Sequence, residues 1–288
     1  MRGKFMKYSM LFAAALVLSA GVVAAKEPAG CELVYSGTAS MDGSERAQYL
    51  QVGDYEKLDA SLEKQLVEHK KGRRSDLMIT RDLYELMQLS GRDLSLFQEW
   101  ADKNPRSFFA NLAYGAYLAE EANTARGSES AARTSQRQIA AMRDIQQRAA
   151  RYLEVARKIK PDSAVPYASL IVMAATQEGS AGVLPLLQAA NKVDPKNLSA
   201  RVAAMSYLDP SWGGSFELVE GVVTEAQQAR LPEGQINYLR YHLTMIKASH
   251  AESIARDKPA ARQLYRDALR MCGNSEGAEA GIGRTGTR

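Results

Sequence analysis

The residues that most often hold metals are few in this chain and widely spaced. Its only histidines are His69, His242 and His250, and it has two cysteines. A structural zinc site takes four such ligands, usually in closely spaced pairs, and no His-x-x-x-His or Cys-x-x-Cys pattern occurs. On one helix, residues 242 and 250 would face different sides. The sequence therefore predicts no metal site and no cofactor.

Motifs for nucleophilic catalysis and phosphate binding are also missing from the sequence. There is no Gly-x-Ser-x-Gly, and Gly213-Gly214-Ser215 lacks the Lys-Ser/Thr ending of a phosphate loop. That segment could present helix N–H groups to an anion, or it could be a structural turn in which Trp212 packs on a neighbouring helix pair. Paired carboxylates such as Glu120-Glu121 have cations nearby. We therefore expect no catalysis, and a cell-wall enzyme is the least favoured alternative.

A basic segment spans residues 126–160, with nine Lys and Arg against three acidic residues. Arg133, Arg137 and Arg151 are expected on the side of a long helix opposite an apolar seam. This face could bind an anionic envelope ligand, such as a phosphorylated glycan or a lipid headgroup, or an acidic peptide. It could equally be the solvated face of the helix. Few aromatic residues interleave with the cations, so we expect no nucleic-acid partner.

Tyrosines recur on the first helices of successive predicted hairpins, at Tyr114, Tyr117, Tyr167 and Tyr207. In stacked helical hairpins this helix lines the concave surface. The tyrosines could line a binding groove there, together with Trp212, or they could fill the core. The core interpretation is favoured, because stacking of neighbouring repeats buries a continuous core.

The first 25 residues have the pattern of a secretory signal peptide. A positive start from Arg2 to Lys7 precedes an apolar run over residues 9–25, which ends in small residues. We expect cleavage after Ala25, a periplasmic or secreted mature chain, and no membrane span after cleavage. The alternatives are an uncleaved anchor, because a run of about 17 residues is at the short end for a span, or a lipoprotein modified at Cys31.

Without the signal, the chain carries 34 Lys and Arg against 33 Asp and Glu, which gives a formal net charge of +1. The basic pI of 8.9 therefore largely reflects the predicted signal peptide. It gives no support for binding to nucleic acid.

Cys31 and Cys272 lie near the two ends of the predicted helical domain. An oxidising compartment would favour a disulfide between them. The ends of a stack of hairpins usually lie far apart, which argues against the bridge. The Gly-containing segment 30–43 could still bring Cys31 back. An intramolecular disulfide and two free or intermolecular thiols are both open alternatives.

The middle of the chain contains a sequence motif that is repeated after 34 residues. Pro161 and Pro195 lie 34 residues apart, as do Ala156 and Ala190. Proline ends a helix, because it has no N–H and clashes with the preceding turn. A 34-residue period with a helix that ends at a proline is typical of tetratricopeptide helix pairs. Trp100 precedes Pro105 by the same number of residues as Ala156 precedes Pro161 and Ala190 precedes Pro195. The sequence therefore predicts a third repeat.

The predicted organisation is all-α throughout. It has an extended segment over residues 26–43, a tetratricopeptide-like domain of stacked helical hairpins over residues 44–272, and a tail over 273–288. The tail has five glycines in 16 residues, which predicts disorder.

Several of these landmarks together resemble one bacterial family, the DUF4034 family of unknown function. They are the turn Trp100-Ala101-x-x-x-Pro105, the helix with Gly115, the two Ala-x-x-x-x-Pro turns, and Asp209-Pro210-Ser211-Trp212-Gly213-Gly214-Ser215. Gly115 falls where tetratricopeptide units place a small residue for close contact between helices. The resemblance would cover about Leu50 to Cys272. It implies a tetratricopeptide-like helical fold, no known activity and no site residues.

The favoured hypothesis is a periplasmic or secreted helical-repeat protein that binds an unknown protein or peptide and has no catalysis of its own. Hairpins that cannot bury their faces alone must stack, and the stack leaves an extended groove. The alternative is a binding protein for an anionic envelope ligand through the basic segment 126–160.

Overall fold

The computed structural model describes residues 30–33, 43–127, 129, 133–273 and 275–286. The predicted signal peptide and most of the extended segment 26–43 lie outside these residues. Within them every regular element is a helix, which confirms the all-α prediction. The elements are α1 (Gly43–Val52), α2 (Tyr55–Lys70), α3 (Leu77–Leu89), α4 (Leu94–Lys103), α5 (Phe108–Arg126), α6 (Gln136–Ile159), α7 (Val165–Glu178), α8 (Ser180–Val193), α9 (Ser199–Met205), the 3₁₀ turn η1 (Pro210–Trp212), α10 (Phe216–Gln228), α11 (Glu233–His250), the π-helical turn η2 (Ala251–Ala255), α12 (Lys258–Cys272) and α13 (Glu276–Thr285).

The repeated prolines end helices, as the sequence predicts. Helices α4, α6 and α8 each stop two residues before a proline, at Pro105, Pro161 and Pro195 respectively. Polar side chains then start helices. Ser107 Oγ accepts a hydrogen bond from the backbone N–H of Ala110 at the start of α5. Ser135 forms a capping box at the start of α6, so that two otherwise unpaired donors gain partners.

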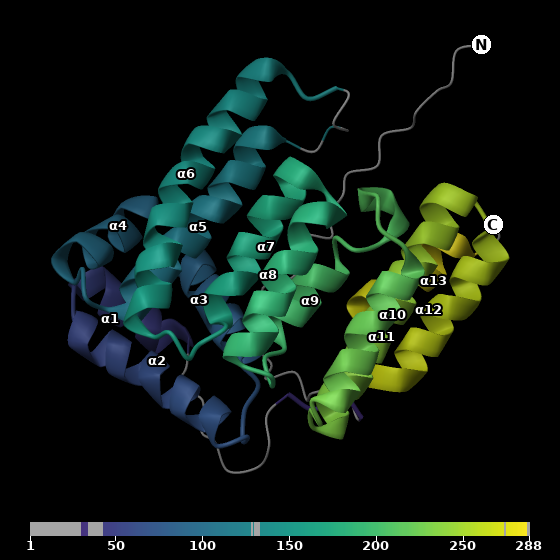
Figure 1. Cartoon of the computed structure of the whole chain (residues 1–288), viewed down its shortest axis with the longest axis horizontal. Coiled ribbons are helices and arrows are strands. Elements are labelled where there is room, and N and C mark those ends of the chain that lie inside the picture. Colours follow the sequence, from purple (N-terminus) through teal and green to yellow (C-terminus); the bar gives the residue numbers. More distant parts are fainter. Residues whose placement is uncertain (1–29, 34–42, 128, 130–132, 274, 287–288) are drawn as a thin grey trace.

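The helices follow one another along the long axis of the molecule, with α1 to α4 at one end and α11 to α13 at the other (Figure 1). Helix α5 packs along α6, α7 along α8, and α11 along α12. Gly115 lets α5 and α6 approach closely, because a Cβ there would lie 2.8 Å from Cγ of Leu153. This is the small-residue contact that the sequence predicts at this position.

The core runs through the molecule as three clusters of buried apolar side chains. The first joins α1 to α7, with Trp100 fully buried in it. The second joins α7 to α11, and the third joins α11 to α13. No helix among the described residues is long and apolar enough to cross a membrane.

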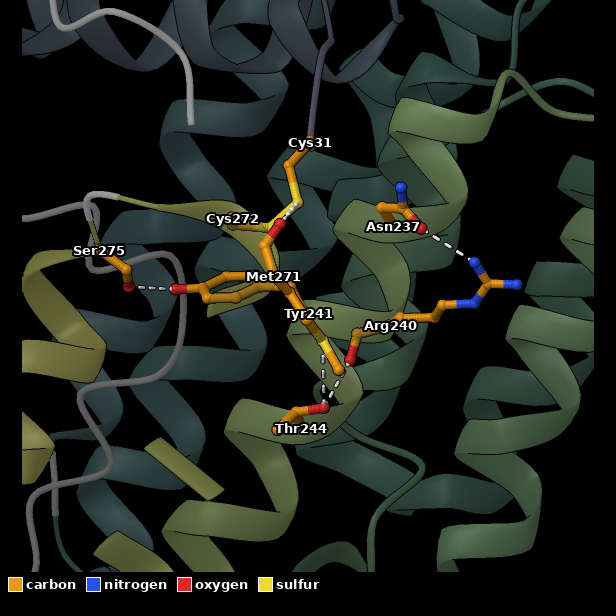
Figure 2. Close-up of a disulfide and its surroundings, with 8 residues drawn as sticks. All are labelled: Cys31, Asn237, Arg240, Tyr241, Thr244, Met271, Cys272 and Ser275. Carbon is orange, nitrogen blue, oxygen red and sulfur yellow. Dashed lines mark hydrogen bonds between the residues drawn. A yellow bond between two sulfur atoms is a disulfide. The ribbon is translucent and has the colours of Figure 1, made fainter. Parts of the chain in front are cut away.

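Cys31 and Cys272 form a disulfide across the molecule, with their Cα atoms 5.2 Å apart (Figure 2). The segment 30–33 lies against α11 and α12, where a Cβ at Gly234 would meet the carbonyl oxygen of Glu32 at 2.7 Å. The carbonyl oxygen of Leu33 also accepts a hydrogen bond from the N–H of Ser75, before α3. The short segment therefore connects the C-terminal helices to the N-terminal ones.

The tail from residue 273 differs from the prediction of disorder, because residues 276–285 form α13. Ser275 Oγ caps this helix at the N–H of Ala278. Gly281 packs against the ring of Tyr265, where a Cβ would lie 2.5 Å from a ring carbon. A glycine that predicted disorder therefore serves close packing instead.

Candidate functional site

The four tyrosines of the candidate surface lie inside the protein. The relative exposures of Tyr114, Tyr117, Tyr167 and Tyr207 are 1, 1, 3 and 5%. The ring of Tyr114 meets Tyr152 edge to face, with centroids 4.6 Å apart. The tyrosines therefore fill the core and do not line an open groove, which corrects their place in the candidate surface.

Trp212 belongs to the turn η1, between α9 and α10. Its ring meets Tyr207 edge to face, with centroids 4.7 Å apart. In the same turn, a Cβ at Gly214 would overlap the carbonyl oxygen of Leu208. These contacts give Trp212 and the glycines a structural role in joining α9 to α10.

The basic segment 126–160 is partly neutralised within the chain. Its ion pairs are Arg133–Glu129, Arg157–Glu154 and Lys160–Glu63, with N–O distances of 3.7, 2.5 and 2.9 Å. Arg137 is exposed on α6 and does not line a described pocket. Arg151 differs from these residues, because it lines a pocket.

That pocket, here called the α4–α6 pocket, has a volume of about 470 Å³. Its walls come from the C-terminal end of α4, the start of α5 and the middle of α6. The lining residues are Ala101, Asp102, Pro105, Asn111, Arg148, Arg151, Tyr152 and Val155. The four residues from α6 are spaced three and four apart, so they share one face of the helix.

Hydrogen bonds within the chain hold Arg148 and Asn111 in the wall of the α4–α6 pocket. Arg148 Nη2 donates a hydrogen bond to the hydroxyl of the buried Tyr114, at 3.1 Å. Asn111 is buried, and its amide nitrogen donates to the carbonyl oxygens of Pro105 and Ser107, at 3.1 and 2.7 Å. Among the described residues neither Arg148 nor Arg151 forms an ion pair. Two guanidinium groups are thus available to a carboxylate or phosphate, which they match with paired N–H donors.

Sequence reasoning named Arg151 but not the other polar residues of this pocket. Arg148 and Tyr152 lie on the same face of α6 as Arg151, and their spacing in the sequence is enough to predict this. Asn111 comes from another helix, and only the packing of α5 on α6 brings it near them. The structure does not bring Arg133 and Arg137 into this pocket.

A family described as a domain of unknown function (DUF4034) matches residues 45–191, just over half of the 288 residues. The chain belongs to the DUF4034 family. The match contains the whole α4–α6 pocket, but it ends before the Trp212 turn and before Cys272. It is therefore shorter than the range Leu50 to Cys272 that the sequence motifs suggested. No curated protein and no solved structure matches the chain.

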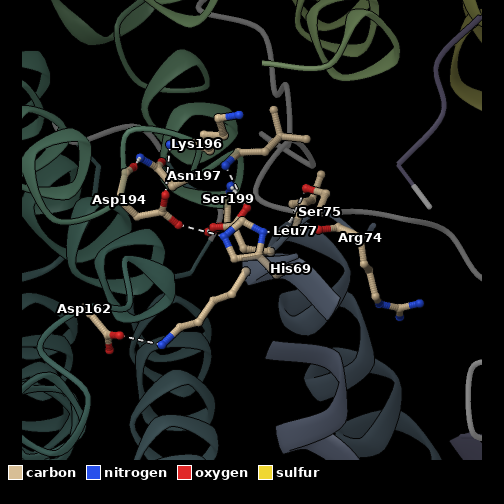
Figure 3. A network of polar contacts seen from close by, with 12 residues as sticks. His69, Arg74, Ser75, Leu77, Asp162, Asp194, Lys196, Asn197 and Ser199 are labelled. Atoms are coloured by element: carbon tan, nitrogen blue, oxygen red, sulfur yellow. Dashed lines mark hydrogen bonds and ion pairs between the residues drawn. The ribbon is translucent and has the colours of Figure 1, made fainter. Parts of the chain in front are cut away.

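A polar cluster around His69 joins the N-terminal helices of the DUF4034 chain to α8 and α9 (Figure 3). His69 Nε2 lies 2.7 Å from Asp194 Oδ2, and Nδ1 lies 3.1 Å from the carbonyl oxygen of Arg74. Asp76 is far from α9 in the sequence, but it caps this helix. Its carboxylate accepts hydrogen bonds from the N–H groups of Leu198 and Ser199 and from the Ser199 hydroxyl.

This cluster has the residue types of a serine–histidine–aspartate triad but not its connections. The Ser199 hydroxyl donates to Asp76, whereas His69 uses both ring nitrogens on other acceptors. A general base needs one free ring nitrogen beside the nucleophile. We therefore assign the cluster a structural role. No three metal-ligating side chains come together in the part of the chain that the structure describes.

The charge state of His69 gives a prediction on pH. Burial of the ring opposes protonation, but the hydrogen bond to Asp194 and the charges of Asp76 and Asp194 outweigh it and raise the pKa of His69 to about 9. Because this pKa lies above the ordinary 6.5, the stabilisation is complete below pH 6.5 and is lost as the pH rises through about 9. As the pH rises through this range, we expect the loss of the His69 charge to lower the free energy of unfolding by about 3 kcal/mol.

Urea unfolding at a series of pH values checks this expectation. His69→Gln should remove most of the pH dependence between neutral and alkaline pH, and it should lower stability most at the neutral end. His250→Gln is the matched control, and it should keep the slope of the unsubstituted protein. Equal slopes in the His69→Gln and unsubstituted proteins would contradict the assignment.

Proposed function

We propose that the chain is an exported helical-repeat interaction module that binds an acidic peptide through the α4–α6 pocket. In this proposal residues 1–25 are a cleaved signal peptide, and the stacked hairpins form a tetratricopeptide-like superhelix. The proposal includes no catalytic step. The Cys31–Cys272 disulfide supports the oxidising compartment, since such bridges persist outside the cytosol.

The observation that carries the proposal is that two arginines, which form no ion pair among the described residues, line the same pocket. Arg148 and Arg151 line the pocket beside the half-buried ring of Tyr152. Asp102 is the only acidic residue in the lining, so the lining has a net charge of +1. An extended peptide would place an apolar side chain against Tyr152 and Val155 and a carboxylate between the guanidinium groups.

Peptide is favoured over an anionic envelope ligand at this place. Within the basic segment, Arg133, Arg157 and Lys160 are paired with acidic residues of the same chain. Among the described residues of this segment, Arg148 and Arg151 are the cations that line a pocket together with an aromatic residue, Tyr152. The pocket is compact, and its net charge of +1 balances the charge of one carboxylate. It therefore fits a peptide side chain or terminus better than a large polyanion.

Selection from a displayed library of random peptides tests this proposal. The immobilised protein should enrich peptides that contain Asp or Glu next to an apolar residue. Arg148→Ala with Arg151→Ala should weaken binding of the selected peptides at least about tenfold, because two charge-assisted hydrogen-bonding partners are lost. Arg137→Ala with Arg143→Ala removes the same charge from the same helix outside the pocket and should change binding little.

Two results would count against the function. One is a library that shows no enrichment over the bare support. The other is equal loss of binding in the pocket and control variants, which would indicate only a general effect of charge. Measurement of the selected peptides at two salt concentrations completes the test, because a charge-driven contact weakens as salt rises.

A further inference from the structure

A second and larger pocket lies at the opposite end of the molecule, between α12 and α13. It has a volume of about 820 Å³, and we call it the α12–α13 pocket. It lies outside the residues that match the family, and outside the α4–α6 pocket. The lining residues are Lys258, Pro259, Arg262, Arg266, Gly283, Arg284, Thr285 and Gly286.

Four cations and no acidic residue line this pocket. Lys258, Arg262 and Arg266 are spaced four apart on α12, so they form one row along the helix. Arg284 reaches the pocket from α13. Among the described residues, Lys258, Arg262 and Arg266 form no ion pair, and Arg262 Nε is buried without a hydrogen-bond partner. The row therefore presents positive charge that no described carboxylate contacts directly.

Arg284 is held in place by its neighbours. Its Nε and Nη2 donate to the two carboxylate oxygens of Glu252, each at 3.0 Å. The hydroxyl of the buried Tyr265 also donates to Glu252, at 2.7 Å. Glu252 stands on the π-helical turn η2, an irregularity that is often found at functional sites. The arginine is thus fixed in orientation at the rim of the pocket.

The charge count and the room in the pocket indicate the size of ligand. Four cations less the carboxylate of Glu252 leave a net charge of +3. A phosphoryl monoester carries about −1.5 to −2 at neutral pH, so two phosphoryl groups match this surplus, whereas one carboxylate does not. Gly283 leaves the wall open, since a Cβ there would meet no atom within 4 Å.

We propose that the α12–α13 pocket binds a ligand that carries two phosphoryl groups, with Arg262, Arg266 and Arg284 as its ligand-binding residues. Arginine recognises phosphate through paired, planar N–H donors. Lys258 adds a point charge at the first turn of α12. The same chemistry is offered by a soluble diphosphate and by phosphate headgroups at a lipid surface.

Calorimetric titration of the full, disulfide-bonded chain with inorganic pyrophosphate tests the proposal. Binding is expected, and it should weaken as salt is added. Arg262→Gln with Arg266→Gln should weaken it by about tenfold or more. Arg270→Gln is the matched control, because Arg270 lies on the same helix, pairs with Asp267 and does not line the pocket. It should change affinity less than about twofold.

Two further arms separate the ligand class and its source. Succinate, a dicarboxylate, should bind much more weakly than pyrophosphate, and equal binding would overturn the phosphoryl assignment. Cosedimentation with phosphatidylcholine vesicles, with and without phosphatidylglycerol, shows whether lipid phosphates are bound and whether pyrophosphate displaces them. Displacement supports a headgroup as the source, and pyrophosphate binding without cosedimentation supports a soluble ligand.

Absence of pyrophosphate binding to the unsubstituted chain would overturn the proposal. So would equal affinity of the Arg262→Gln/Arg266→Gln variant. Circular dichroism and the melting temperature show that the variants are folded. If the glutamine pair destabilises the chain, Arg266→Gln alone is the substitute, since Arg266 is exposed and its loss should still reduce affinity.

Discussion

Reduction of the Cys31–Cys272 disulfide will lower the free energy of unfolding by up to about 5 kcal/mol. The two cysteines are 241 residues apart, so the bridge closes a very long loop and restricts the unfolded chain strongly. Both side chains are buried at 2% exposure, so loss of the bridge also loosens the segment 30–33 from α11 and α12. Thermal unfolding with and without a reductant measures the effect.

The double variant Cys31→Ser/Cys272→Ser is the control for the reductant. It should unfold at the lower temperature whether or not a reductant is present. Peptide mapping without reduction should find the two cysteines in one cross-linked fragment. An unfolding temperature that does not change on reduction, or a fragment pattern with two free thiols, would contradict the bridge and its role.

Replacement of Asp82 should cost about 3 to 5 kcal/mol, because it removes the negative partner of a buried charge cluster. The side chain of Asp82 is 8% exposed and lies between Arg46 on α1 and Arg74 before α3, at N–O distances of 3.4 and 3.0 Å. In Asp82→Asn the two buried guanidinium groups would lose the carboxylate that both of them contact. Chemical denaturation of the variant gives the loss directly.

Arg46→Met tests whether stability depends on the balance of charges in this cluster or only on the burial of charged side chains. It removes a buried cation whose Nε has no hydrogen-bond partner among the described residues, and it leaves Asp82 paired with Arg74. We expect a loss well below that of Asp82→Asn, because replacing part of a buried ionic group by an apolar side chain is often nearly neutral. Equal losses in the two variants would show that the charge cluster does not govern stability here.

The sequence predicts the local features of this fold well. Pro105, Pro161 and Pro195 fix where helices stop, and Gly115 marks the close contact of α5 with α6, because both effects depend on single residues and their neighbours. The basic segment also points to Arg151. Each of these predictions needs only spacing along one helix.

Features that depend on packing between distant segments could not be predicted. The bridge of Cys31 to Cys272 depends on the path of segment 30–33 across α11 and α12. Glycine composition suggested disorder after residue 273, yet Gly281 is small so that α13 can lie on Tyr265. Asn111 joins the α4–α6 pocket only through the pairing of α5 with α6.

The α12–α13 pocket could not be predicted from the sequence for the same reason. The row of cations on α12 is visible in the sequence, but Arg284 lies in the segment that was expected to be disordered. A cationic row on one helix is most often a solvated face. Only the docking of α13 turns that row into the wall of a pocket.

Hydrogen exchange with a peptide of alternating glutamate and leucine, compared with a peptide of alternating glutamine and leucine, tests the binding of acidic peptides most directly. We expect the glutamate peptide to protect the backbone around residues 101–111 and 148–155, which carry the α4–α6 pocket. This protection should disappear in Arg148→Ala/Arg151→Ala and should be absent with the glutamine peptide. Protection centred elsewhere on the chain, or unchanged protection in the pocket variant, would contradict the binding of acidic peptides at this site.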